Sequence, residues 1–308
     1  METEKNELAP LPINHGLPLG ASLFTMFLCI LFGANAVAIK ISLTGLGIFT
    51  TAGVRFGIAG MVIFLWARCT GNSLTVTPAK YRHLIILAIL FYVQLSLFYF
   101  GLSKTTASHG TLIVNVLPFV VMILAHYFIP GDTINLKKIF GLILGFSGVA
   151  ILFFDNIVMT GDALQGDLLV LLAVLIWGCH IIYIKKIIAG FHPIQITFYP
   201  ISMAAPIFIL SGFLWDTEMV RFIDASIIKA MVYQTFVTAS FGLVAWNTMI
   251  QRFGATALHS FIFIMPVSGV FLGIILLNEP ITTNLVSSIL LVVSGLIVVN
   301  RVGANRTR

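Results

Sequence analysis

LFGANAVAIK at residues 31–40 and IWGCHIIYIK at residues 176–185 share one pattern, in which a glycine precedes a lysine by seven residues. Further along each half, Asp132 and Glu279 each stand sixteen residues before the glycine of a Ser-Gly pair. A proline precedes each of these acids at a similar distance: Pro118 and Pro266. Three matches in the same order indicate that the chain contains an internal duplication.

The composition is that of a protein whose main solvent is lipid. Of its 308 residues, 59% are hydrophobic and 9% are charged, whereas soluble domains carry about 25% charged residues. The net charge of +6 is spread singly or in pairs between apolar stretches, so it does not form the basic patch of a nucleic-acid-binding protein. Three cysteines without CxxC spacing predict neither a disulfide framework nor a metal site.

Apolar stretches long enough to cross about 30 Å of hydrocarbon as a helix recur along the whole chain. We place ten of them at residues 20–40, 48–66, 83–102, 106–128, 137–154, 167–184, 194–214, 227–250, 255–277 and 283–300. Their length and their lack of alternating polarity argue against membrane strands. The predicted fold is all-α and integral to the membrane. Because each half has five spans, the ten helices form two inverted five-helix repeats.

The repeats set the expected domain boundaries and the basic residues set the orientation. We expect a tail at 1–18, a first repeat at 19–154, a second repeat at 155–300 and a basic tail at 301–308. With both termini on one side, twelve Lys and Arg residues fall on that side and four on the other. Since positive charge stays in cytoplasmic loops, both termini are predicted to be cytoplasmic.

At this point the chain resembles the EamA-type permeases of the drug/metabolite transporter superfamily. The resemblance is carried by the two five-span units, the Phe32-Gly33 and Trp177-Gly178 openings, the paired prolines, acids and Ser-Gly steps, and one feature of the second span. That feature is Arg55-Phe56 followed by Ala59. The resemblance covers residues 20–300 and implies a carrier of amino acids, other metabolites or toxic compounds, commonly an exporter in bacteria.

Acidic residues distinguish the chain from small multidrug-resistance relatives, which carry a glutamate inside their first span. All eleven acids here are expected in tails, loops or span edges. That placement argues against antiport of cationic drugs driven by a membrane carboxylate.

Arg55 is the strongest single candidate for a substrate-binding residue. An arginine in mid-span costs about 2.5–3.5 kcal/mol on insertion scales, so it normally faces a cavity or a partner. We expect it to attract a carboxylate or another anionic group of the solute. The alternative is a structural arginine that binds backbone carbonyls or extends to the interface.

Asn35 and His180 occupy equivalent positions in the two repeats, which predicts that both lie where the repeats meet. Trp177, three residues before His180, shares its helix face, and an aromatic ring beside a hydrogen-bonding group suits a small amphipathic solute. His180 is also our candidate for proton coupling, because histidine changes charge near neutral pH. The alternative for His180 is a buried histidine bonded to a neighbouring helix.

Four further residues complete the predicted substrate-binding set: Tyr99, Asn115, Trp246 and Asn247. Tyr99 belongs to a polar stripe in the third span, and such a stripe avoids lipid. Hydrogen bonding between helices is the alternative for all four residues. Two more histidines, His109 and His259, fall near the starts of spans and are expected at the membrane interface.

The leading hypothesis is a secondary transporter that exports an amino acid or a related compound by alternating access. An importer of a vitamin, nucleotide or methyl-donor metabolite is the main alternative, and a membrane-embedded lipid-modifying enzyme is a minor one. No cofactor, metal or nucleic acid is expected. The expected partners are a small-molecule solute and the lipid bilayer, with proton coupling left open. The expected state is a monomer or homodimer in the bacterial inner membrane.

Overall fold

A computed structural model describes residues 18–129, 134, 136–159, 161–253, 261–262 and 264–304, and the predicted tail at 1–18 and Asp132 fall almost wholly outside these ranges. The helices are α1 (Leu19–Gly33), α2 (Asn35–Leu43), α3 (Ile48–Cys69), α4 (Tyr81–Lys104), α5 (Ala107–Val114), α6 (Leu117–Phe128), α7 (Leu136–Met159), α8 (Gly161–Ile187), α9 (Pro193–Trp215), α10 (Ala225–Val232), the π-helix η3 (Tyr233–Gly242), α11 (Leu243–Phe253), α13 (Ile264–Leu277) and α14 (Thr283–Ala304). The short 3₁₀ turns are η1 (Pro78–Lys80) and η2 (Ile188–Gly190).

Helix length and polarity confirm an all-α membrane protein. Within the described residues, six helical stretches are long and apolar enough to cross a bilayer, and three shorter apolar helices accompany them. Large apolar side chains such as Leu23, Met61, Phe213 and Leu290 stand on the outer surface of the bundle. Exposed apolar side chains at this density belong in lipid.

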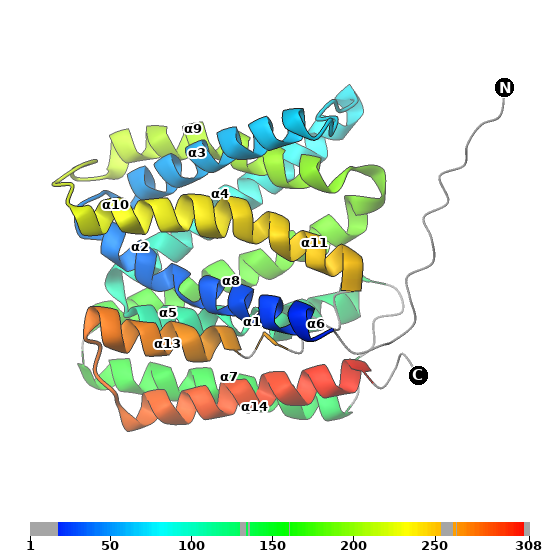
Figure 1. Cartoon of the computed structure of the whole chain (residues 1–308). Helices are drawn as coiled ribbons and strands as arrows, with labels where there is room; N and C mark the ends of the chain where they lie inside the picture. The colour runs from blue at the N-terminus through cyan, green and yellow to red at the C-terminus, as the bar shows by residue number, and fades with distance from the viewer. Residues whose placement is uncertain are drawn as a thin grey trace.

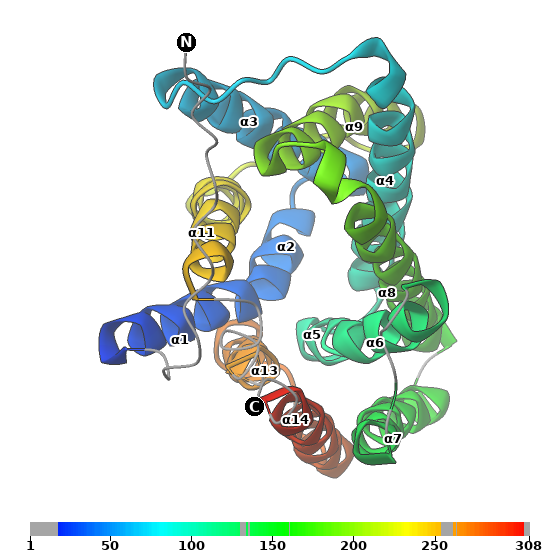
Figure 2. The ribbon, with the colours of Figure 1, turned by 90° about the vertical axis from the view of Figure 1, so that its right-hand side faces the viewer.

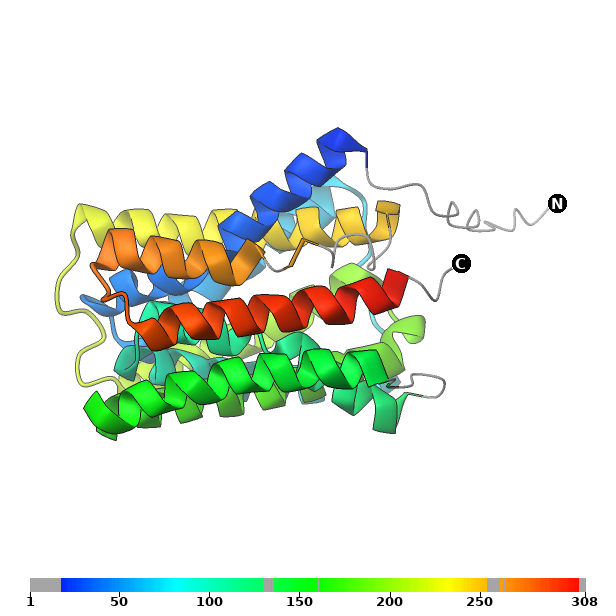
Figure 3. The same ribbon diagram turned by 90° about the horizontal axis from the view of Figure 1, so that it is seen from below.

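The two ends of the bundle differ in the connections that they carry. The start of α1 and the end of α14 lie together at one end, which we call the proximal end (Figures 1 and 3). The connections α2–α3, α4–α5, α9–α10 and α13–α14 lie at the opposite, distal end. A chain that starts and finishes at the same end crosses the membrane an even number of times, which agrees with the ten predicted spans.

Packing between the halves follows a pattern of exchange. Viewed along the helices, the α3–α9 pair lies at one edge of the bundle and the α7–α14 pair at the opposite edge (Figure 2). When the two halves are exchanged, the contacts between α4 and α8 in one interface correspond to the contacts between α10 and α2 in the other. Contacts of α6 with α8 likewise correspond to contacts of α1 with α13. Exchanging the halves therefore reproduces the main contacts, as two inverted copies of one unit require.

Two membrane-length stretches of the first half are interrupted. The helix of the first span breaks at Ala34, between α1 and α2. That of the fourth breaks at Asn115 and Val116, directly before Pro118 in the first turn of α6. Proline has no N–H to donate and is tolerated in a first helical turn, so Pro118 begins a new helix here. Asn35 and Asn115 therefore stand at helix breaks, although the backbone N–H groups of Ala34, Asn115 and Val116 keep hydrogen bonds to the preceding turn.

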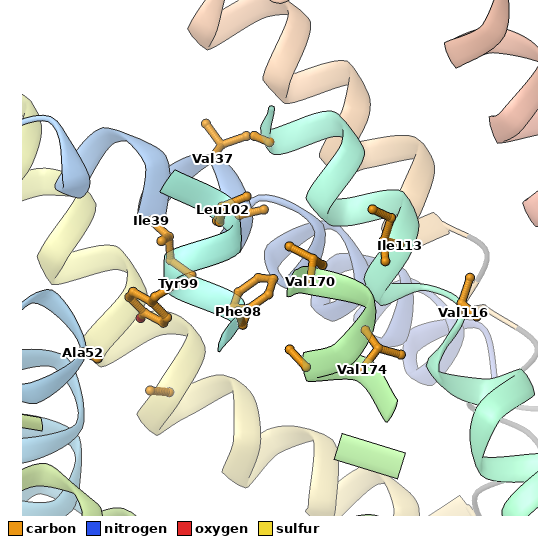
Figure 4. Packing of buried hydrophobic residues seen from close by; sticks show 14 of the residues in the cluster. Val37, Ile39, Ala52, Phe98, Tyr99, Leu102, Ile113, Val116, Val170 and Val174 are labelled. Carbon is orange, nitrogen blue, oxygen red and sulfur yellow. The ribbon is translucent and has the colours of Figure 1, made fainter. Parts of the chain in front are cut away.

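Small residues allow the helices of different halves to approach closely. A side chain on Gly33 would meet the backbone of Met265 and Gly269, and one on Gly166 would meet the backbone of Gly101 and Thr105. Around these crossings runs one continuous apolar core that includes Val37, Tyr99, Ile113 and Val170 (Figure 4). Without a hydrophobic driving force in lipid, such close backbone contacts hold membrane helices together.

At the distal end, two carboxylates from the second half cap helices of the first half. Asp216, after α9, accepts bonds from the N–H groups of Phe49 and Thr50 at the start of α3, at 3.2 and 2.9 Å. Glu279, after α13, accepts bonds from the N–H groups of Ala107 and Ser108 at the start of α5, at 2.6 and 2.9 Å. The positive end of a helix dipole favours such anions, so these acids fix α3 and α5 across the half-to-half interface.

Candidate functional site

Arg55 lies buried in α3 and binds two hydroxyl groups from other helices. Only 7% of the residue is exposed. Its Nη1 donates to the Tyr99 hydroxyl of α4 at 2.9 Å, and its Nη2 donates to the Thr238 hydroxyl of η3 at 3.2 Å. It is the eighth residue of α3, so it lies about 10 Å along the axis from the distal end of that helix. The predicted second span and α3 begin at the same residue, so Arg55 lies in the distal half of the helix, about two turns from its start.

The hydrogen bonds continue from Tyr99 and Thr238 to three further residues and form a network, which we call the Arg55 network. Thr238 Oγ1 lies 3.0 Å from Asn35 Oδ1, at the start of α2. The Tyr99 hydroxyl donates to Gln234 Oε1 at 3.3 Å, and Gln234 Nε2 donates to Ser42 Oγ of α2 at 2.7 Å. The predicted residues Asn35, Arg55 and Tyr99 thus come together from α2, α3 and α4, with η3 of the second half closing the network.

The guanidinium of Arg55 has no carboxylate partner among the described residues. Its bonds go to neutral hydroxyls, its Nε atom has no hydrogen-bond partner, and its Cζ lies 4.9 Å from the centre of the Phe56 ring. A buried charge without a counter-charge is costly in a medium of low dielectric constant. The site is therefore electrostatically suited to an anionic group.

Gln234 and Thr238 lie on the π-helix η3, and our sequence reasoning missed both residues. Both side chains are buried, at 0% and 2% exposure. A π-helix turns more widely than an α-helix and is frequently found at functional sites. A signal was present in the sequence, because Gln234, Thr235, Thr238 and Ser240 place four polar side chains in seven residues of an apolar span.

His180 of α8 lies near the Arg55 network but belongs to a separate group. Its Nδ1 atom is 3.3 Å from Gln94 Oε1, and its Nε2 atom is buried without a hydrogen-bond partner. The Phe91 ring packs against both His180 and Phe56, with ring centres 6.3 and 5.0 Å apart. His180 is thus connected to the residue next to Arg55 through one aromatic side chain.

The remaining predicted residues are more dispersed. Asn115 is buried at the break between α5 and α6, where its Nδ2 donates to the Thr111 carbonyl at 2.7 Å. Trp177 is partly buried on α8. Trp246 packs edge-on against Phe32, in a small cluster apart from the main core. The side chain of Asn247 falls outside the described part of the structure.

One prediction about the distal end is wrong. Asp167 is not at a span edge, because α8 begins six residues earlier and the Asp167 side chain is fully buried. His109 is the third residue of α5, near the helix start, but it is only 7% exposed and its Nδ1 lies 2.9 Å from an oxygen of Asp167. Two distant polar residues become buried together only when their helices cross. His259 lies outside the described residues.

Comparison with known proteins assigns the chain to a class. A model of the EamA-like transporter family matches residues 19–154 and again 164–301. The chain is 21% identical over 269 residues to the "Uncharacterized transporter YoaV" of Bacillus subtilis, covering 87% of this chain and 92% of the relative. It is 26% identical over 287 residues to the "Probable amino-acid metabolite efflux pump" of Escherichia coli, covering 88% and 91%.

The fold also matches a solved structure. It superposes on a crystal structure with a TM-score of 0.68 at 16% identity, covering 93% of this chain and 98% of the other. Similarity at this identity shows the fold alone. The two matches to the family model span nearly the whole sequence and agree with the duplicated pattern of glycines, prolines and acids. The chain is a multi-pass membrane transporter of small molecules, not an enzyme, and it belongs to the EamA-like transporter family.

Proposed function

We propose that this transporter exports an amino acid or a related metabolite by alternating access, and that Arg55 binds the carboxylate of the solute. The observation that carries the proposal is the buried Arg55 guanidinium, whose described partners are all neutral. A carboxylate accepts two parallel bonds from a guanidinium and supplies the missing charge. The relatives named as amino-acid metabolite efflux pumps support this class of solute.

The Arg55 network contributes to alternating access because it joins the two halves. Arg55 and Tyr99 belong to the first half, and Gln234 and Thr238 to the second. A solute carboxylate that binds Arg55 competes with the Thr238 hydroxyl for the same N–H groups. Binding therefore weakens one contact between the halves at the moment when the solute neutralises the charge, which favours movement of one half against the other.

The direct test uses purified protein in liposomes and counterflow of labelled amino acids, which needs no imposed ion gradient. Each solute is compared with its amide, which has the same shape but no negative charge. We expect the wild type to transport the acid at least about tenfold faster than the amide, because losing one partner of a buried charge pair reduces affinity by at least this factor. Arg55→Gln should remove most of this preference.

Arg68→Gln is the matched control, because Arg68 lies on the same helix but is exposed at its proximal end. It should keep both transport and the preference for the acid. Equal transport of acid and amide by the wild type would contradict the proposed role of Arg55. Counterflow of a vitamin or nucleotide, with no amino acid transported, would favour the alternative class of cargo.

We further propose a bacterial inner-membrane location with both termini in the cytoplasm, so that the distal end faces outward. The distribution of Lys and Arg supports this orientation, and the relatives from Bacillus subtilis and Escherichia coli support a bacterial membrane. Export predicts that inside-out membrane vesicles take up the labelled solute. Uptake only into right-side-out vesicles would indicate an importer.

A further inference from the structure

The distal end holds a buried ion pair that the Arg55 network does not use. His109 Nδ1 of α5 lies 2.9 Å from an oxygen of Asp167 of α8, and their side chains are 9% and 0% exposed. The other oxygen of Asp167 accepts a short bond from the Thr105 hydroxyl. A proton on Nδ1 is donated to the carboxylate at this distance, and a second proton on Nε2 makes the imidazole a cation that pairs with Asp167.

The pair joins the two halves, because α5 belongs to the first half and α8 to the second. Other bonds between the halves surround it. Glu279 of the second half binds the start of α5, two residues from His109. Within the first half, Lys40 of α2 donates to the Thr105 carbonyl at 2.6 Å and so joins α2 to the start of α5. Any opening of the distal end that separates α5 from α8 must break the contact between His109 and Asp167.

The charged groups on the surrounding helices determine how the protonation state of His109 changes the local charge. Two lysines lie on neighbouring helices: Lys40 on α2, and Lys104 on α4, whose Nζ donates to Gln165 at 2.6 Å. The acids are Asp167 and the exposed Asp162 on α8, and Glu279 after α13. The acid Asp155 of α7 has a side chain outside the described part of the structure. Within the described residues, a proton on His109 offsets the charge of the fully buried Asp167 carboxylate. A neutral His109 leaves an excess negative charge in a poorly solvated place.

We propose that His109 and Asp167 form the proton-binding site of this transporter, and that the charged pair holds the distal end closed. This inference rests on the proposed function, in which the distal end faces outward. A proton taken up from outside closes that end, and its release to the cytoplasmic side while the distal end is closed lets that end open again. Proton entry would thereby be exchanged for solute leaving the cell.

The chemistry of the site favours a proton over a metal ion. The described residues contain no group of three or more His, Cys, Asp or Glu side chains able to hold a metal. The site also differs from our sequence-based candidate for proton coupling, since the described partners of His180 are a neutral amide and an aromatic ring.

The first test needs no solute. Cys29, Cys69 and Cys179 are replaced, and Val170→Cys reports opening, because Val170 is fully buried one turn along α8 from Asp167. A membrane-impermeant maleimide is applied at pH 5.5 and pH 8. Each labelling rate is divided by the rate measured for Ile281→Cys, an exposed position at the same end. This division removes the pH dependence of the reaction between the thiol and the maleimide. We expect the normalised rate to rise at least about threefold at pH 8 as His109 loses its charge.

His109→Gln should remove this dependence and give equal normalised rates at both pH values. Asp167→Asn keeps the imidazole and removes its counter-charge, so it should also reduce the ratio and serves if the glutamine variant does not fold. His83→Gln is the matched control, because His83 bonds to Tyr183 near the proximal end, and it should keep the wild-type ratio. A pH-independent rate in the wild type, or an unchanged ratio in both pair variants, would overturn the proposal.

The second test separates this inference from the proposed function. The solute found by counterflow is loaded into liposomes and a pH gradient is imposed. We expect His109→Gln to lose at least about tenfold of the gradient-driven flux while it keeps counterflow within about twofold, since only the proton step is removed. If the wild type shows counterflow but a pH gradient does not drive net transport of the solute, proton coupling is refuted and the solute assignment stays intact. Loss of counterflow in the Arg55 variant alone bears on the solute site.

Discussion

At the scale of single residues, Arg55 is the position where charge, burial and contacts conflict. Its side chain is buried, it holds a positive charge, and its described hydrogen-bond partners are the hydroxyls of Tyr99 and Thr238. Those hydroxyls orient the guanidinium without neutralising it. The arginine is therefore preorganised for a ligand that brings the opposite charge.

Tyr99 positions Arg55, so its hydroxyl should influence solute affinity. We predict that Tyr99→Phe raises the half-saturation concentration for counterflow roughly two- to tenfold. This corresponds to the loss of one hydrogen bond with a net value of about 0.5–1.5 kcal/mol. The matched control is Tyr92→Phe on the same helix, which loses a 2.7 Å bond to Ser211 of α9 instead. A larger effect from the Tyr92 variant than from the Tyr99 variant would contradict the assignment.

Arg55→Lys tests whether the shape of the cation matters as well as its charge. Lysine keeps the charge but lacks the planar fork that reaches Tyr99 and Thr238 together. We predict that counterflow stays within about threefold of the Arg55→Gln value. Recovery of wild-type counterflow by lysine would show that charge alone is sufficient at this position.

At this scale, the sequence predicts the residues that stand out as single anomalies. An arginine in a span and an asparagine at a repeated position are visible without a structure, and Arg55, Asn35 and Tyr99 do share one network. Thr238 and the pair of His109 with Asp167 are not visible in this way. Asp167 lies 58 residues from His109 in sequence, and only the crossing of α5 and α8 brings the two together.

At the scale of helices, the carboxylates at the distal end determine where α3 and α5 begin. Asp216 accepts bonds from two backbone N–H groups of α3 and from the Thr50 hydroxyl at 2.8 Å. The sequence cannot predict this cap, because the acid and the helix lie 166 residues apart. Sequence signals for helix starts depend on a capping residue directly before the helix.

Removing the charge at Asp216 should destabilise the protein by the value of a helix cap. Asn keeps only one acceptor oxygen and no charge at the helix N-terminus, so we predict that Asp216→Asn lowers the melting temperature of the detergent-purified protein by about 2–4 °C, corresponding to about 1 kcal/mol. Glu218→Gln is the control, because Glu218 is exposed and forms only a 3.8 Å pair with Arg221. A change of the same size in both variants would contradict a specific capping role.

Helix crossings depend on glycine at particular positions. A Cβ atom on Gly166 would lie 2.8 Å from the backbone nitrogen of Thr105 and 2.9 Å from the Gly101 carbonyl oxygen, too close for any side chain. Gly166→Ala should therefore destabilise the protein by about 1–3 kcal/mol and reduce the monodisperse fraction in size-exclusion chromatography. Gly20→Ala, which has nothing within 4 Å, should leave both properties unchanged.

At the scale of the whole molecule, the duplication explains both the fold and the location of the site. The all-α class follows from composition, since long apolar stretches have only one way to satisfy their backbone groups in lipid. The paired motifs predict two related halves, which the two matches to the family model agree with. The sequence cannot predict how the halves pack, because that depends on helix crossings, on the π-helix η3 and on caps formed between the halves.

The most direct test of the account is the side of the membrane on which each half begins. Single cysteines at Asp162, at the exposed start of α8, and at Asn6 and Thr307 in the two tails are labelled in intact cells with an impermeant maleimide. Two inverted halves predict that Asp162→Cys reacts from outside and that both tail cysteines react only after the cells are opened. Labelling of all three positions from one side would contradict the inverted halves and, with them, the alternating-access carrier.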